Sequence, residues 1–165
     1  MDTINAYAAG IFDGEGYVDI YSATPPKASK SPSFLIRVII SQKDGRLINW
    51  LESNFKGHVY SARKEGKYPI YRWDSRAQNA LNFLKAIQPF VVVKKDQVDL
   101  AIKFEERKQQ YVFMPKGSQG FNKISPEEIK WRLEMKDNLK SLKKNYIPYT
   151  KNSAPTTTNR EEVLK

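Results

Sequence analysis

The first pattern along the chain is a helical one near its N-terminus. Asp2 or Thr3 can cap a helix that runs to about Asp13. Gly14 and Gly16 then end the helix and permit an abrupt change of direction. The apolar face of this helix is formed by residues at helical spacing, namely Ile4, Tyr7, Ala8, Ile11 and Phe12. A second face carries almost no side-chain volume and consists of Ala6, Ala9 and Gly10.

Alternating polar and apolar residues after this helix predict strands over 17–23 and 34–42. Asp44 then caps a helix that extends to about Phe55. Two further strands and three further helices are predicted, over 58–62, 70–74, 77–87, 94–109 and 125–144. The order α-β-β-α-β-β-α, followed by C-terminal helices, indicates an α+β fold with an antiparallel sheet. We expect one domain over 1–145 and an extended tail over 146–165, which is rich in Pro, Thr and Asn.

The charge of the chain is strongly positive, at +10 for 165 residues. This charge favours a polyanionic partner such as nucleic acid over a basic protein without one. The sequence has no cysteine, which excludes disulfides and cysteine zinc sites, and its single histidine, His58, leaves little basis for histidine-dependent catalysis. The apolar run over 90–93 is far too short to span a bilayer. We therefore expect a soluble intracellular protein with no membrane partner, in a prokaryotic cytoplasm or nucleoid or in an organelle.

The segment 8–16, with the sequence AAGIFDGEG, resembles the LAGLIDADG motif of homing endonucleases. Its replacements keep apolar positions apolar, small positions small and the last acid acidic. The element order predicted over about 3–110 is also that of this family. The resemblance implies an intron-encoded enzyme, such as those of archaeal ribosomal-RNA introns. Such an enzyme makes a double-strand break in a long pseudo-palindromic DNA site by Mg²⁺-dependent phosphodiester hydrolysis.

The motif occurs once, so its helix is expected to pack against the same helix of a second copy in a homodimer. Small residues allow two helix backbones to approach closely. The expected interface residues are Ala6, Ala9, Gly10 and Asp13. Asp13 lies inside the helix end, where it is expected to hydrogen-bond backbone groups or the partner helix rather than a metal. A tight helix crossing within one chain is the alternative for the small face.

Glu15 is the expected catalytic acid and metal ligand. Two copies of Glu15 near the dyad, with backbone carbonyls such as that of Gly14, would offer the hard oxygen donors that Mg²⁺ prefers, with Mn²⁺ tolerated. An acid at the C-terminal end of a helix faces an unfavourable dipole, which suggests a cation nearby. The alternative is a solvated acid at a helix end. By the same family resemblance, Gln42 would hold an active-site water, Arg46 would lie near the scissile phosphate, and Lys94 would be the active-site lysine.

The sheet face opposite the core is expected to read double-stranded DNA, because a curved antiparallel ribbon fits the major groove. Arg37 and Arg72 can each make a bidentate contact with guanine. The full set of expected DNA-binding residues is Asp19, Tyr21, Ser33, Arg37, Ile39, Lys43, Tyr60, Arg72, Asp74 and Lys95. Leu35 and Ile39 are apolar for an exposed face, which leaves the parity of their strand open. By resemblance, the tail segment 151–159 would also reach DNA.

Other functions remain open. A PD-(D/E)xK nuclease would need an acid-x-Lys sequence on a central strand, whereas those at 65–67, 128–130 and 134–136 fall in a predicted turn and a predicted helix. The stronger alternative is a protein with the same fold that acts as an RNA maturase, with RNA as partner, or as a DNA-binding regulator that does not cut.

Overall fold

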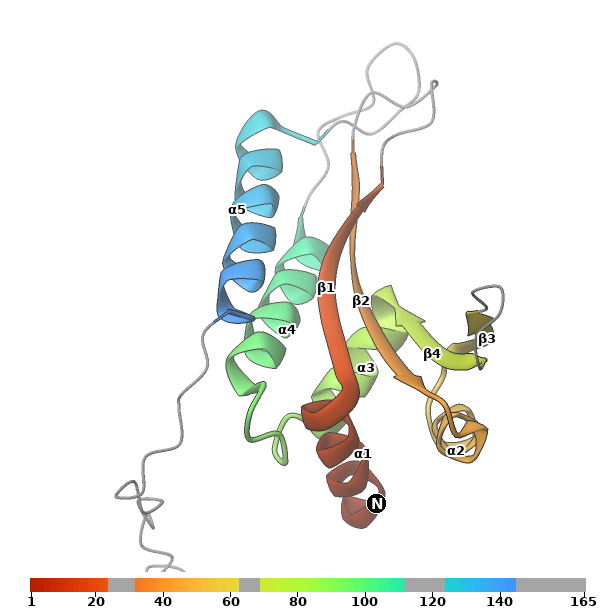
Figure 1. The fold of residues 1–165 in the computed structure, drawn as a ribbon. Coiled ribbons are helices and arrows are strands. Elements are labelled where there is room, and N and C mark those ends of the chain that lie inside the picture. Colours follow the sequence, from red (N-terminus) through yellow and green to blue (C-terminus); the bar gives the residue numbers. More distant parts are fainter. Residues whose placement is uncertain (24–31, 63–68, 112–123, 145–165) are drawn as a thin grey trace, which may run out of the picture.

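The computed structural model describes residues 1–23, 32–62, 69–111 and 124–144. The elements follow the predicted order, which confirms the α+β fold (Figure 1). They are α1 (Asp2–Glu15), β1 (Gly16–Ala23), β2 (Ser33–Gln42), α2 (Gly45–Asn54), β3 (His58–Ala62), β4 (Ile70–Arg76), α3 (Ala77–Ile87), α4 (Lys95–Gln110) and α5 (Pro126–Leu142). The predicted tail over 146–165, with its segment 151–159, lies outside the described residues.

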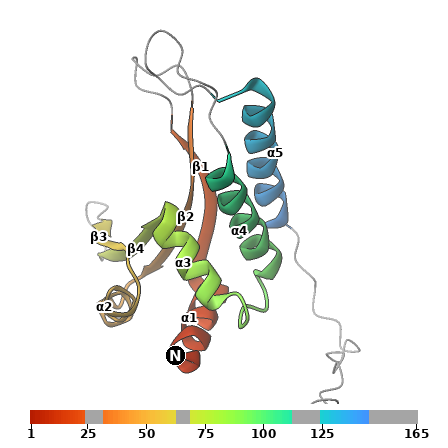
Figure 2. The ribbon, with the colours of Figure 1, turned by 180° about the vertical axis from the view of Figure 1, so that it is seen from behind.

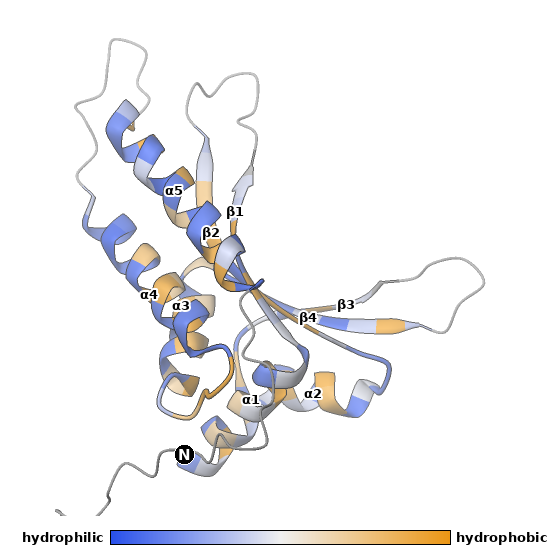
Figure 3. Cartoon of the chain, turned by 60° about the vertical axis from the view of Figure 1, so that its left-hand side comes forward, coloured by the Kyte–Doolittle hydropathy of each residue, from blue (hydrophilic) through white to orange (hydrophobic). Residues whose placement is uncertain are grey.

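The four strands form one antiparallel sheet in the order β1-β2-β4-β3. The long strand β2 is therefore central, and it pairs with β1 along one edge and with β4 along the other. The hairpins β1–β2 and β3–β4 diverge from the middle of the sheet, which leaves an open, strongly twisted surface (Figure 3). In the view of Figure 1, α3 lies behind the sheet, and α4 and α5 lie to the left of β1; seen from the other side, α3 lies in front of the sheet (Figure 2).

The sheet has a buried inner face and a partly exposed outer face. Val18 and Ile20 of β1, and Trp73 of β4, are fully or almost fully buried on the inner face. The alternate residues of β2 follow the same pattern, with Phe34, Ile36, Val38 and Ile40 buried in the core. Leu35 and Ile39 lie on the outer face despite their apolar side chains, so the strand parity deduced from the sequence is confirmed.

Helix ends follow local side-chain chemistry. The carboxylate of Asp44 accepts a hydrogen bond from the Arg46 N–H at the start of α2, which confirms the predicted cap. At the start of α5, the Ser125 hydroxyl accepts from the Glu128 N–H. Helix α1 runs further than predicted and ends at Glu15, because Gly16 is where the chain turns into β1. A Cβ at Gly16 would overlap the ring and main chain of Phe12, so glycine is required there by close packing.

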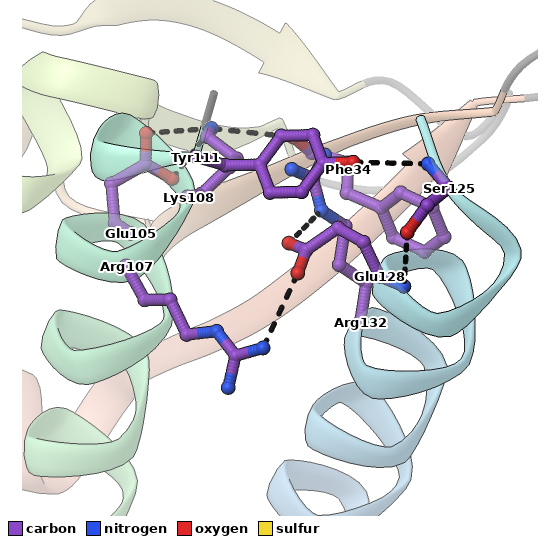
Figure 4. A network of polar contacts seen from close by, with 8 residues as sticks. All are labelled: Phe34, Glu105, Arg107, Lys108, Tyr111, Ser125, Glu128 and Arg132. Carbon is purple, nitrogen blue, oxygen red and sulfur yellow. Dashed lines mark hydrogen bonds and ion pairs between the residues drawn. The ribbon is translucent and has the colours of Figure 1, made fainter. Parts of the chain in front are cut away.

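Helix α5 is fixed to α4 and the sheet by a network of buried charges (Figure 4). The Glu128 carboxylate accepts from Arg132 Nε at 2.8 Å and from Arg107 Nη2 at 3.3 Å. Lys108 Nζ donates to the buried Glu105 carboxylate at 2.7 Å and to the Phe34 carbonyl of β2 at 3.3 Å. The fifth helix thus packs onto the sheet and α4, and the single domain expected over 1–145 stays a prediction. Among the described residues, no helix combines the length and apolar character that crossing a membrane requires.

Candidate functional site

The junction between α1 and the sheet brings together residues from three distant segments. Glu15 is the last residue of α1, and Gly16 begins β1 opposite Ile40 of β2. Gln42 ends β2 two residues beyond Ile40, so the end of β2 runs past the end of α1. Lys94, immediately before α4, contacts the same junction from the third segment.

Lys94 closes the C-terminal end of α1. Its Nζ donates to the main-chain carbonyls of Phe12 at 2.9 Å and Gly16 at 2.7 Å, and lies 5.5 Å from the centre of the Phe12 ring. Burial lowers the pKa of Lys94, while the nearby carboxylates of Asp13 and Glu15 act in the opposite direction. The predicted active-site lysine therefore lies beside the predicted catalytic acid, as a half-buried cation held by two carbonyls.

Asp13 fixes the segment that carries this lysine. Its two carboxylate oxygens accept hydrogen bonds from the backbone N–H groups of Val92 at 2.8 Å and Lys94 at 2.9 Å. The prediction that Asp13 hydrogen-bonds backbone groups is confirmed. A contact between Asp13 and a partner helix stays a prediction.

Glu15 is exposed at the end of α1, and among the described residues its carboxylate makes no hydrogen bond or ion pair. The neighbouring main chain at Gly14 is also open, because a Cβ placed there would meet no atom within 4 Å. Oxygen donors from this carboxylate and from helix-end carbonyls fit a hard divalent cation. Within the described part of the chain, however, no group of three or more acids or histidines could hold a metal. One chain thus offers only part of a metal site.

Gln42 and Arg46 lie on the other side of the end of β2. They line a surface hollow of about 450 Å³ together with Tyr7, Asp44, Leu47 and Trp50. The Gln42 Oε1 accepts from the Lys43 N–H at 2.9 Å. Arg46 is 91% exposed and pairs with Asp44, which lowers the pKa of that carboxyl to about 2. Within one chain, Arg46 is therefore held at the start of α2 by its own aspartate.

The exposed side of α1 differs in one residue from the predicted small face. Ala6, Gly10 and Gly14 are exposed and recur at intervals of four residues. Ala9 was predicted to lie in this interface, but that prediction is wrong: its side chain is fully buried with Ala8 and Phe12 in the core of its own subunit. The stripe that remains open to a partner is narrower than expected and is continuous with Glu15.

The outer face of the sheet carries most of the predicted DNA-binding residues. Strand register places Asp19, Tyr21, Ser33, Arg37, Ile39, Tyr60 and Arg72 on this face. Lys43 is exposed just beyond β2. Lys95 is the first residue of α4, in the helical layer, and its Nζ lies 4.0 Å from Asp99 Oδ2. Asp74 was expected to be available to DNA, but it is only 3% exposed. Its carboxylate is paired with Arg76 instead.

Two basic residues at this surface were not expected from the sequence. Arg76 belongs to β4, which extends two residues beyond its predicted end. The available signal was that Asp74 and Arg76 carry opposite charges two positions apart, on one face of a strand. Lys143, at the end of α5, lies with its Nζ 3.8 Å above the ring of Tyr17 of β1. Burial lowers the pKa of Lys143. No local signal links Lys143 to Tyr17, because their contact depends on how α5 packs.

Comparison with solved structures identifies the fold. The archaeal intron-encoded homing endonuclease I-Vdi141I, complexed with DNA, matches with a TM-score of 0.66 and 16% identity, over 90% of this chain and 90% of that chain. The homing endonuclease I-CvuI, in complex with a DNA target, matches with a TM-score of 0.65 and 13% identity, over 90% of this chain and 87% of that chain. The LAGLIDADG meganuclease I-AabMI, bound to uncleaved DNA, matches with a TM-score of 0.57 and 15% identity, over 79% of this chain but 44% of that chain.

In sequence, no family model and no curated protein matches the chain. The structural matches to I-Vdi141I and I-CvuI nevertheless each cover 90% of it. The chain therefore has the LAGLIDADG homing endonuclease fold, as the motif at 8–16 and the element order predicted.

Proposed function

We propose that this protein is a site-specific homing endonuclease, encoded within an intron, that cuts both strands of a long pseudo-palindromic DNA site as a homodimer. The observation that carries this proposal is the exposed, unpaired Glu15 carboxylate at the end of α1, beside the half-buried Lys94. These two residues lie at the foot of an open sheet in a chain of net charge +10. An acid, a cation and an open basic surface together suit phosphodiester hydrolysis.

The outer face of the sheet is proposed as the DNA-binding surface. The sheet is antiparallel and twisted (Figure 3). By strand register, its outer face carries Tyr21, Arg37, Tyr60 and Arg72. Side chains on such a ribbon can reach base edges in the major groove, while exposed lysines such as Lys43 contact phosphates. The DNA complexes of I-Vdi141I and I-CvuI support DNA as the partner of this fold.

The homodimer is proposed to form through the exposed stripe of α1. Ala6, Gly10 and Gly14 would allow two copies of the helix to cross closely, and the stripe ends at Glu15. An isologous contact there would bring the two Glu15 carboxylates together and complete the donor set that one chain lacks. The match to only 44% of I-AabMI supports a unit that functions in pairs.

Mg²⁺, or Mn²⁺ in its place, is proposed to be held by Glu15 and the Gly14 carbonyl, and there it would neutralise phosphate charge and favour a hydroxide nucleophile. The protein's own residues would do the rest. Lys94 places a positive charge next to Glu15, where it can stabilise the charge that develops on the phosphate. Gln42 would orient a water molecule through its amide, and Arg46 would leave Asp44 to contact a phosphate once DNA is bound.

Cleavage of a target-site library with Mg²⁺ tests this function, with the wild type compared with Glu15→Gln. We expect the wild type to cut and Glu15→Gln to bind the same sites without cutting. Glu52→Gln, which alters an exposed acid on α2, is the matched control and should cut like the wild type. If wild type and Glu15→Gln both bind DNA and neither cuts, the protein is a regulator or a maturase. Cutting by Glu15→Gln would show that the catalytic acid lies elsewhere.

A further inference from the structure

Two ion pairs lie next to each other on the outer face of the sheet. Arg37 of β2 donates from Nε to Asp19 Oδ1 at 3.2 Å and from Nη2 to Asp19 Oδ2 at 2.8 Å. Arg76 of β4 donates from Nε to Asp74 Oδ1 at 2.9 Å and from Nη2 to Asp74 Oδ2 at 2.6 Å. The two arginines are direct Cα partners in the β2–β4 register, so both side chains project from the same face.

Both arginines use the same edge of the guanidinium group. In each pair the Nε and one N–H of Nη2 are engaged by the aspartate. Within the described residues, Nη1 of neither arginine makes a hydrogen bond, so its two N–H groups and the second N–H of Nη2 remain available. One N–H from each terminal nitrogen then forms a parallel pair of donors. Such a pair matches the O6 and N7 acceptors of guanine in the major groove.

The aspartates hold the arginines in place. The Asp74 side chain is only 2% exposed, and that of Asp19 is 19% exposed, so both carboxylates are largely shielded from solvent. Arg37 also lies 5.0 Å above the ring of Tyr21, which restrains it from a second side. Hydrogen bonding to Asp19 and to Asp74 raises the pKa of Arg37 and of Arg76, respectively. A guanidinium group that is already held in place before DNA binds loses less conformational entropy when it contacts a base.

We propose that Arg37 and Arg76 read guanines on two neighbouring base pairs, and that Asp19 and Asp74 are positioning residues that fix these arginines for that contact. Directly opposed residues of antiparallel strands lie about 5 Å apart, close to the roughly 3.4 Å rise of one base pair. Two long side chains can therefore reach successive steps. This inference rests on the proposed DNA-binding function and adds a sequence preference: two adjacent guanines in each half of the site.

Arg72 provides an internal contrast. It lies on the same face of β4, opposite Ser41, but the described residues offer it no carboxylate ion pair, and its buried Nε lacks a hydrogen-bond partner there. Arg72 is therefore not fixed by an acid, and the proposal assigns the strongest guanine preferences to the two paired arginines instead.

Selection from a pool of randomised DNA duplexes, in EDTA so that nothing is cut, tests the proposal with the full-length chain. The wild type should select adjacent guanines in each half-site. Arg37→Lys and Arg76→Lys keep the charge but lack the fork, so each should lower guanine preference at one position by roughly fivefold or more. Asp19→Asn and Asp74→Asn should weaken the same two preferences, respectively, with the arginines still present. Thermal unfolding of each variant checks that it is folded. The two lysine variants keep the buried Asp74, so they test the proposal even if Asp74→Asn does not fold.

Glu106→Gln is the matched control, because it removes one acid from the Lys85–Glu106 ion pair in the helical layer. It should leave every base preference unchanged. Equal weakening of all sequences by the arginine and aspartate variants would overturn the proposal, since the pairs would then only stabilise the sheet or contact phosphates. Selection of a site without guanine at the positions sensitive to Arg37 and Arg76 would also overturn it while leaving DNA binding intact. If the wild type selects no duplex, the proposed function itself fails.

Discussion

The Asp13 side chain binds the main chain of Lys94, and the Lys94 side chain binds the main chain around Asp13. The Asp13 carboxylate accepts the backbone N–H of Lys94 at 2.9 Å, and the Lys94 ammonium donates to the carbonyls of Phe12 and Gly16 on either side of Asp13. The end of α1 and the segment before α4 therefore form one rigid unit, although they are about 80 residues apart in the sequence. Glu15 lies within this unit, so the geometry around the proposed catalytic acid depends on it.

Removal of the Asp13 carboxylate should impair this unit. Asp13→Ala leaves the N–H groups of Val92 and Lys94 without their partner, which should lower the free energy of unfolding by about 1–3 kcal/mol. Urea unfolding measures this loss. Cleavage should fall by more than DNA binding, because Lys94 is no longer held beside Glu15.

Asp13→Asn is the companion variant. Its amide oxygen can accept one of the two N–H groups, so both the stability and the cleavage rate should lie between those of the wild type and Asp13→Ala. Asp96→Ala, which changes an exposed acid in the first turn of α4, is the control for the general loss of a carboxylate. Equal cleavage by the wild type and a folded Asp13→Ala would show that Lys94 does not need this anchor.

A bulky residue at Gly10 should separate the subunits. No atom lies within 4 Å of a Cβ placed there, so Gly10→Leu fits within one chain and should not lower its thermal stability. It would, however, prevent two copies of α1 from approaching closely. Sedimentation should then find a folded monomer, with cleavage of both strands lost. Asn138→Leu, at an exposed position of α5, should remain a dimer; a dimeric Gly10→Leu would place the interface elsewhere.

Much of this arrangement follows from local sequence patterns. The caps at Asp44 and Ser125, and the alternation that separates the two faces of β2, depend on neighbouring residues and were predictable. The burial of Ala9 was not, because a small side chain fits equally well in a core or at an interface.

The features that the sequence left open depend on tertiary register. The Asp74–Arg76 pair lies where β4 continues beyond its predicted end, and its place beside Arg37 is set by how β2 pairs with β4. Lys143 reaches Tyr17 because α5 packs against α4 and β1, where Arg107 bonds to Glu128 and Lys136 bonds to Ser22. Spacing along the chain carries no information about either contact.

Lys143 should make stability depend on pH at the alkaline end. Burial lowers its pKa in the folded state below the ordinary value of 10.5, so the unfolded chain binds its proton more tightly. The charged Lys143 therefore lowers the free energy of unfolding by its full amount below the pKa that it has in the folded protein, and this loss disappears as the pH rises toward 10.5. The free energy of unfolding of the wild type should therefore rise relative to that of Lys143→Met across this window.

Urea unfolding of both proteins at several values between pH 8 and 10.5 measures this difference. Lys140→Met, on the same helix but exposed, supplies the baseline for the loss of a lysine. A difference between the wild type and Lys143→Met that stays constant over this range, or falls, would mean that Lys143 is not desolvated by its contact with Tyr17.

Ala77, where β4 passes into α3, has a φ of 48°, in the left-handed region that favours glycine. An L-residue there costs about 1–2 kcal/mol, and the greater freedom of glycine in the unfolded chain offsets part of the gain from replacing it. Ala77→Gly should therefore raise the free energy of unfolding by up to about 1 kcal/mol. Ala86→Gly, in the same helix but without a positive φ, should lower it by about 1 kcal/mol. Opposite signs in thermal or urea unfolding would confirm that the turn into α3 is strained, whereas equal destabilisation by the two changes would contradict it.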